Sequence, residues 1–138
     1  MATTTATLIL SSADVTGHNF SMTQTATLTK AASSTGLDEF TGITSRKYPA
    51  AQTDTVVVAD SIYVHSGAVA HKVYIRNTST GNSDYILVEL GGSNIIMGRL
   101  YPGDWCFFPY DGTLDVDIDT SAANMKVEYA VFSQSTAS

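Results

Sequence analysis

The sequence predicts an all-β fold, a single antiparallel β-sandwich of jelly-roll-like form spanning residues 1–138. From Thr53 onward, short segments that alternate apolar and polar residues follow one another at regular turn spacing, which is typical of sandwiches and barrels. No segment shows the 3.6-residue period of an amphipathic helix, so helix content should be close to nil. Residues 98–112, GRLYPGDWCFFPYDG, predict a strand, a turn, a short aromatic strand and a second turn, the pattern of a sandwich corner.

The first 36 residues predict either an N-terminal arm or edge hairpin, or two strands of the same sandwich. Thr, Ser and Ala dominate this stretch, and TATLIL at 5–10 is echoed by TATLTK at 25–30. Threonine on alternate positions suits a pleated strand with one buried face. The residues of this stretch that we expect to contact another subunit are Leu8, Leu10 and Leu28.

Residues 37–53 are expected to form a long loop or a crossover, because they contain Gly42 and Pro49 and few large apolar side chains. Further strands are expected within 54–66, 71–77, 84–90, 95–101, 105–109, 114–119 and 125–132, which gives eight to ten in all. Within 71–77, Val73 and Ile75 should point inward, with Lys72, Tyr74 and Arg76 outward.

The chain carries little charge. Only 14% of its residues are charged, against about 25% in an ordinary globular protein. A surface rich in Thr and Ser is desolvated at low cost, which favours protein partners. The net charge of −6, with seven scattered basic residues, argues against nucleic-acid binding. The N-terminal segment predicts no signal peptide and no membrane span, so we expect synthesis in a cytosol.

The sequence predicts no catalytic, cofactor-binding or metal-binding residue, and hence no enzyme. No Ser-His-Asp spacing, phosphate-binding loop or carboxylate dyad stands out. Cys106, the single cysteine, lies in an apolar run and is expected to be a small core residue rather than a nucleophile.

Two groups of side chains leave metal binding open. Asp115, Asp117 and Asp119 share one face of a strand, about 6.5–7 Å apart, which favours a solvated outer face over a shared calcium ion. His65 and His71 flank SGAVA, where a hairpin would set them opposite each other, but a third ligand is lacking for zinc. All three histidines, His18, His65 and His71, are therefore expected to face solvent at strand ends.

Gly103 and Pro109 match part of the second sequence motif of cupins, which are metal-binding jelly rolls. The position of that family's metal-ligating histidine is Leu114 here, and its first motif has no counterpart between His65 and Glu89. The resemblance therefore implies a jelly roll without the metal centre.

A second resemblance extends over residues 70–132. The order HKVYIRNTS, YILVEL, GRLYPGDWCFFPYDG and VEYAVF resembles small all-β virion proteins of tailed bacteriophages, particularly marine ones. The most distinctive element is RLYPGDW at 99–105. This resemblance implies a non-enzymatic structural subunit, made in the bacterial host cytoplasm and present in many copies on the virion.

On this basis we expect a capsid decoration or cement protein that binds the major capsid protein and itself, as a homotrimer. Trp105 and Phe107 share one parity of their strand, and Cys106 and Phe108 the other, so one set should be buried and the other exposed. The aromatic contact candidates are Tyr101, Trp105, Phe107, Phe108 and Tyr110.

Two other functions stay open. One is a tail-fibre-associated or host-binding module that recognises carbohydrate through Tyr63, Tyr74, Tyr85 or Trp105. The other is a cupin-like metalloenzyme.

Overall fold

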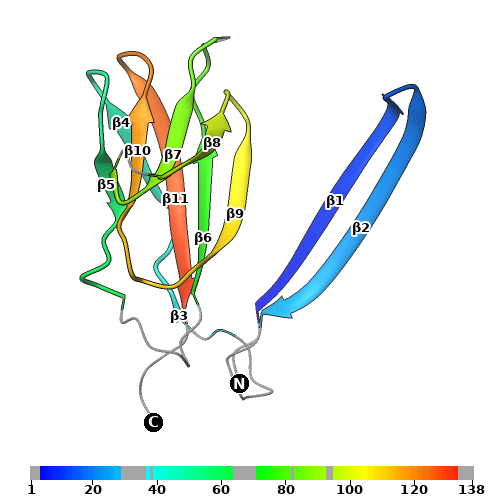
Figure 1. Ribbon diagram of the computed structural model, residues 1–138, viewed down its shortest axis with the longest axis horizontal. Helices are drawn as coiled ribbons and strands as arrows, with labels where there is room; N and C mark the ends of the chain where they lie inside the picture. The colour runs from blue at the N-terminus through cyan, green and yellow to red at the C-terminus, as the bar shows by residue number, and fades with distance from the viewer. Residues whose placement is uncertain are drawn as a thin grey trace.

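The fold is built from β-strands in two packed sheets with a separate N-terminal hairpin (Figure 1). The computed structural model describes residues 4–28, 37, 39–63, 71–81, 83–92 and 95–133. These ranges contain no α-helix, and no helix in them is long and apolar enough to cross a membrane. The strands are β1 (Thr4–Val15), β2 (His18–Leu28), β3 (Glu39–Phe40), β4 (Thr44–Tyr48), β5 (Thr55–Val58), β6 (His71–Asn77), β7 (Ile86–Leu90), β8 (Ile95–Leu100), β9 (Trp105–Tyr110), β10 (Val116–Thr120) and β11 (Met125–Ser133).

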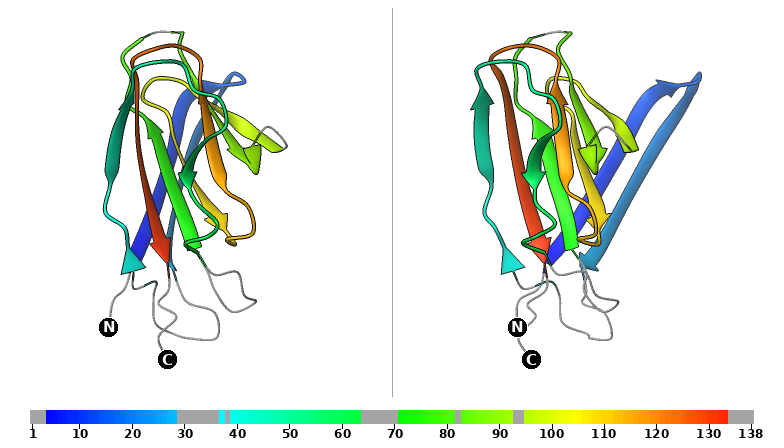
Figure 2. Two further views of the ribbon diagram at one scale, coloured as in Figure 1. Left: turned by 90° about the vertical axis from the view of Figure 1, so that its left-hand side faces the viewer. Right: turned by 60° about the vertical axis from the view of Figure 1, so that its left-hand side comes forward.

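The strand order is that of a jelly roll. One sheet has the order β5-β10-β7-β8, and the other has the order β3-β11-β6-β9, with β4 also paired to β11. The chain pairs as one long antiparallel hairpin that is folded over on itself. From its ends to its middle, the pairs are β4–β11, β5–β10, β6–β9 and β7–β8. Figure 2 shows the resulting two layers. The predicted all-β sandwich of jelly-roll form is thus confirmed.

The core lies between these two sheets. In β6 the side chains of Val73 and Ile75 are fully buried, and the alternation predicted for this strand is confirmed. Val116 and Ile118 of β10 meet them from the opposite sheet and are equally buried. Burying one such side chain contributes about 1.5–3 kcal/mol, so these central strands carry much of the stability.

A buried asparagine organises the corner before β9. The backbone N–H of Asp104 donates to the carbonyl of Tyr101 at 2.8 Å, and Gly103 supplies the positive φ of +90° that this turn needs. Asn77 is fully buried, and its side-chain Nδ2 donates to the Leu100 carbonyl at 2.8 Å. The backbone carbonyl of Asn77 accepts from the backbone N–H of Gly103 at 2.8 Å. The end of β6 therefore fixes the turn that the sequence predicted.

Residues 37–53 contain two short strands, where a loop or crossover was expected. Both β3 and β4 pair with β11 and form the edge of the five-stranded sheet, with Tyr48 opposite Met125. Tyr48 packs into the core, whereas residues 44–47 are exposed. Because an edge strand buries few side chains, its composition is close to that of a loop.

The N-terminal hairpin lies outside both sheets (Figure 1, blue). In the described residues β1 and β2 pair only with each other, so that the two echoed TAT segments face one another, with Ala6 opposite Ala26. At the hairpin base, the backbone N–H of Leu37 donates to the Leu28 carbonyl at 2.7 Å, and its carbonyl accepts from Thr4 Oγ1 at 3.2 Å. Leu37 is 2% exposed and closes this end of the hairpin.

Candidate functional site

The hairpin has one apolar face and one hydroxyl-bearing face. Cross-strand pairs such as Leu10 with Met22 lie on the apolar face, and Leu10 is 44% exposed. The opposite face carries threonine and serine, with Thr7 Oγ1 and Thr25 Oγ1 hydrogen-bonded at 3.1 Å. Ile9, which is 66% exposed, is the large apolar residue of that second face.

The outer face of the five-stranded sheet carries an aromatic cluster. The rings of Phe40 and Phe132 are stacked with centroids 4.6 Å apart, and Phe107 meets Phe132 edge-on at 6.0 Å. Phe40 and Trp105 remain about half exposed. Exposed apolar groups gathered in this way are typical of surfaces that bind another molecule.

The aromatic cluster and the hairpin together form a groove. Its volume is about 690 Å³, and its lining is mainly apolar. Leu8 and Ala26 contribute from the hairpin, and Tyr74, Trp105 and Phe107 from the sheet. The hairpin lies near the sandwich at one end and diverges from it toward the other (Figures 1 and 2).

The groove brings several of the predicted contact residues together. Leu8, Leu28, Trp105 and Phe107 line it, although Leu28 at the hairpin base is already buried. Leu10 lies further along the same hairpin face. Trp105 and Phe107 lie on the outward face of β9 and Phe108 on the inward face, so the structure decides between the two parity sets that the sequence left open.

The remaining aromatic candidates lie elsewhere. Phe108 and Tyr110 point into the core and are 9% and 7% exposed, so they pack the sandwich and present no surface for a subunit contact. The hydroxyl of Tyr110 donates to the Leu114 carbonyl at 2.6 Å. Tyr101 is exposed but packs against Tyr85, with ring centroids 5.9 Å apart.

Cys106 packs against the edge of the core and is partly buried, as expected of a small core residue. Burial raises the pKa of its thiol from 9.0 to about 11, against a small lowering by a backbone hydrogen bond with Ile75. A thiol with such a pKa is protonated at neutral pH and is a poor nucleophile.

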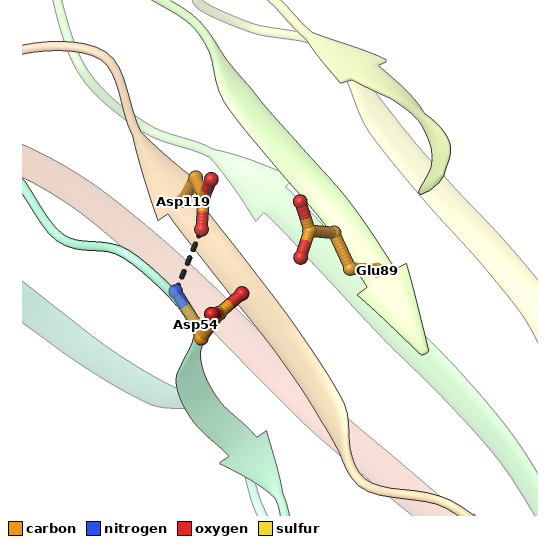
Figure 3. Close-up of side chains that lie close together, drawn as sticks. All are labelled: Asp54, Glu89 and Asp119. Atoms are coloured by element: carbon orange, nitrogen blue, oxygen red, sulfur yellow. Dashed lines mark hydrogen bonds between the residues drawn. The ribbon is translucent and has the colours of Figure 1, made fainter. Parts of the chain in front are cut away.

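Carboxylates from three segments of the chain converge on the outer face of the four-stranded sheet. Asp54 precedes β5, Glu89 lies in β7 and Asp119 in β10, and each offers an oxygen within 4.8 Å of the other two. Figure 3 shows these three side chains turned toward one another. Asp117 faces Glu89 directly across the β7–β10 pair.

The solvated acidic face expected at Asp115, Asp117 and Asp119 is wrong for Asp117. This residue is 3% exposed, because β10 is an inner strand and Gly92, in the turn that follows β7, donates its backbone N–H to Asp117 Oδ2. Asp115 and Asp119 are half-buried, and Asp115 Oδ1 accepts from Asp60 N–H at 2.8 Å.

Burial makes the carboxyl groups of Glu89 and Asp117 hard to ionise. Burial raises the pKa of Glu89, which is 1% exposed, and the neighbouring Asp119 and Asp54 raise it further. Burial also raises the pKa of Asp117, while the hydrogen bond from Gly92 opposes this. Either a proton or a cation therefore stabilises the cluster.

The histidines do not form a recognisable metal centre in the part of the chain that is described. His18 is exposed at the start of β2. The expectation that His71 faces solvent is wrong: it is buried, because it lies on the same inward face of β6 as Val73 and Ile75. Its ring is edge-on to Tyr63 at 5.2 Å between ring centroids and tilted against Tyr110 at 6.2 Å. The expected partner of His71, His65, lies outside the described residues.

Comparison of the chain with protein-family models, with curated proteins and with solved structures found no match.

Proposed function

We propose that this chain is a non-enzymatic bacteriophage virion structural protein, a capsid decoration or cement protein. In this proposal it is made in the host cytoplasm, assembles as a homotrimer, and binds the outer lattice of the major capsid protein, which it stabilises. The observation that carries the proposal is the hairpin outside the sandwich, which presents an exposed apolar face beside an aromatic groove.

The exposed apolar surface gives the proposal its driving force. Leu10 is 44% exposed and Phe20 is 46% exposed on the same hairpin face, and Phe40 and Trp105 are about half exposed on the sheet. Covering such surface gains about 25 cal/mol per Å². A lattice neighbour that fills the groove would bury the hairpin and the sheet face together.

The hairpin also offers hydrogen bonds. Since β1 and β2 pair only with each other in the described residues, each presents one free strand edge. Such an edge adds to the sheet of a neighbour through backbone hydrogen bonds alone. The Thr and Ser side chains of the second face cost less to cover than charged side chains would, because desolvating a hydroxyl is less unfavourable than desolvating an ion.

The number of copies per particle tests this role. Purified virions of the phage that encodes the chain should contain it in the hundreds, on the outer capsid surface in an image reconstruction. A few dozen copies or fewer at the tail would instead establish the tail-associated role. Absence from the virion would overturn both.

Carbohydrate binding is the second candidate, since Tyr74 and Trp105 line the same groove. Tyr63 and Tyr85 lie apart from it, packed against His71 and Tyr101 respectively. Aromatic rings of this kind stack on apolar faces of sugars, and saturation-transfer NMR with host-surface glycans would detect it. Binding that survives Trp105→Ala would exclude the groove as the sugar site.

A further inference from the structure

The acidic cluster has the spacing of a cation site. Oxygens from Asp54, Glu89 and Asp119 all lie within 4.8 Å of one another. Calcium binds oxygen at about 2.3–2.6 Å, so two of its ligands are at most about 5 Å apart. One ion placed among the three carboxylates would thus contact an oxygen of each with only small side-chain movements.

Buried oxygens without partners point independently to a ligand. Glu89 Oε2 and Asp117 Oδ1 are shielded from solvent and have no hydrogen-bond partner among the described residues. Glu89 is 1% and Asp117 3% exposed. A side chain added at Gly92 would contact both Asp54 and Asp117, so Asp117 lies at the edge of the same cluster. Buried charges are rarely left unpaired unless a metal or a proton neutralises them.

We propose that Asp54, Glu89 and Asp119 bind a calcium ion on the outer face of the four-stranded sheet, with Asp117 as an adjacent fourth carboxylate. The oxygen-only donor set selects a hard cation. Calcium fits better than magnesium, because it accepts six to eight ligands in irregular geometry, whereas magnesium demands a near-ideal octahedron. Solvent reaches the exposed Asp54, so water would complete the coordination.

The ion would tie together three parts of the sandwich. Asp54 lies in the segment that leads into β5, and this segment is already held to β10 where Gln52 N–H donates to Thr120 Oγ1 at 2.8 Å. Glu89 belongs to β7 on the other side of β10. Calcium should therefore stabilise the jelly roll itself, whatever the chain does as a whole.

Thermal unfolding of the full chain with and without calcium tests the proposal. After dialysis against a chelator, Tm should rise by roughly 10 °C when free calcium exceeds its Kd about a hundredfold. Calorimetric titration should show one site per chain. An unchanged Tm and no binding at about 5 mM calcium, above the range of weak extracellular sites, would overturn it. An equal response to magnesium would overturn the assignment to calcium.

Two variants locate the site. Glu89→Gln should abolish the calcium response and, in chelator, unfold at or above the wild-type Tm, because it removes a buried charge. Asp54→Asn should weaken calcium binding at least about tenfold while keeping the fold, since asparagine tolerates the φ of +50° found at Asp54. Asp14→Asn removes an exposed carboxylate from β1, which is not part of the sheet that carries the cluster, and should respond as wild type. A full calcium response in Asp54→Asn would contradict the proposed ligands even if Glu89→Gln failed to fold.

Discussion

The backbone N–H of Asp54 donates to Oδ1 of Asp119 at 2.7 Å, although the two residues are 65 positions apart in the chain. The bond joins the segment before β5 to the inner strand β10, and it places the Asp54 carboxylate beside those of Glu89 and Asp119 (Figure 3). The hydrogen bond that joins these two segments of the sandwich thus also brings the three carboxylates close together.

The burial of Glu89 and Asp117, together with crowding by neighbouring carboxylates, predicts how stability depends on pH in metal-free protein. The pKa values of Glu89 and Asp117 are raised above 4.5 and 3.8, so the folded state binds more protons than the unfolded state. The stabilisation is complete below the unfolded pKa values, near pH 4, and is lost as pH rises through the folded ones. We therefore expect Glu89→Gln to have a higher Tm than wild type in chelator above about pH 4, and the difference between the two Tm values to increase as pH rises.

Comparing Glu89→Gln with wild type at each pH cancels the effect of the other carboxylates, because both proteins contain them. A Tm difference that stays constant between pH 4 and 8, or that shrinks as pH rises, would show that Glu89 is not crowded in the way described.

The stability of the chain should reside in the sandwich and not in the hairpin. Ile75 is fully buried, so Ile75→Ala should lower the free energy of unfolding by about 2–5 kcal/mol. Ile9 is 66% exposed, and Ile9→Ala should change it by no more than about 0.5 kcal/mol. Urea titration followed by circular dichroism measures both, and a comparable loss for the two variants would contradict this division.

Neighbouring residues on opposite faces of the hairpin should differ in particle binding. Leu10 belongs to the apolar face, so Leu10→Ser should weaken binding to capsids about ten- to a hundredfold, the loss of about 1.5–3 kcal/mol. Ile9→Ser on the hydroxyl-bearing face should leave binding nearly unchanged. Co-sedimentation with capsids that lack the protein gives both affinities, and equal losses would mean that the apolar face is not the contact.

Alternation along single strands was enough to predict much of the fold. Val73 and Ile75 could be assigned to the core because β6 is an inner strand with one face turned inward. The turn at 101–104 could be predicted from its Pro-Gly-Asp sequence, since glycine accepts the positive φ. Strand β4 was missed, because an edge strand with exposed polar residues has the composition of a loop.

The candidate sites were harder to predict, because they depend on register between distant segments. Spacing along β10 alone keeps its carboxylates about 6.5–7 Å apart, whereas the observed cluster is assembled across strands, with Glu89 opposite Asp117. The groove likewise arises only where Leu8 of the hairpin approaches Phe107 of the sheet. Parity identified Trp105 and Phe107 as one set without showing which set faced outward.

Removal of residues 1–36 tests most directly whether the chain acts by being bound through its hairpin. All eight strands of the jelly roll lie within 44–133, so the truncated chain should fold and unfold cooperatively. It should bind protein-deficient capsids at least about tenfold more weakly than the full chain, since the hairpin carries several exposed apolar side chains. A folded truncated chain that binds as tightly as the full chain would contradict the account, and an unfolded one would show that the hairpin belongs to the core.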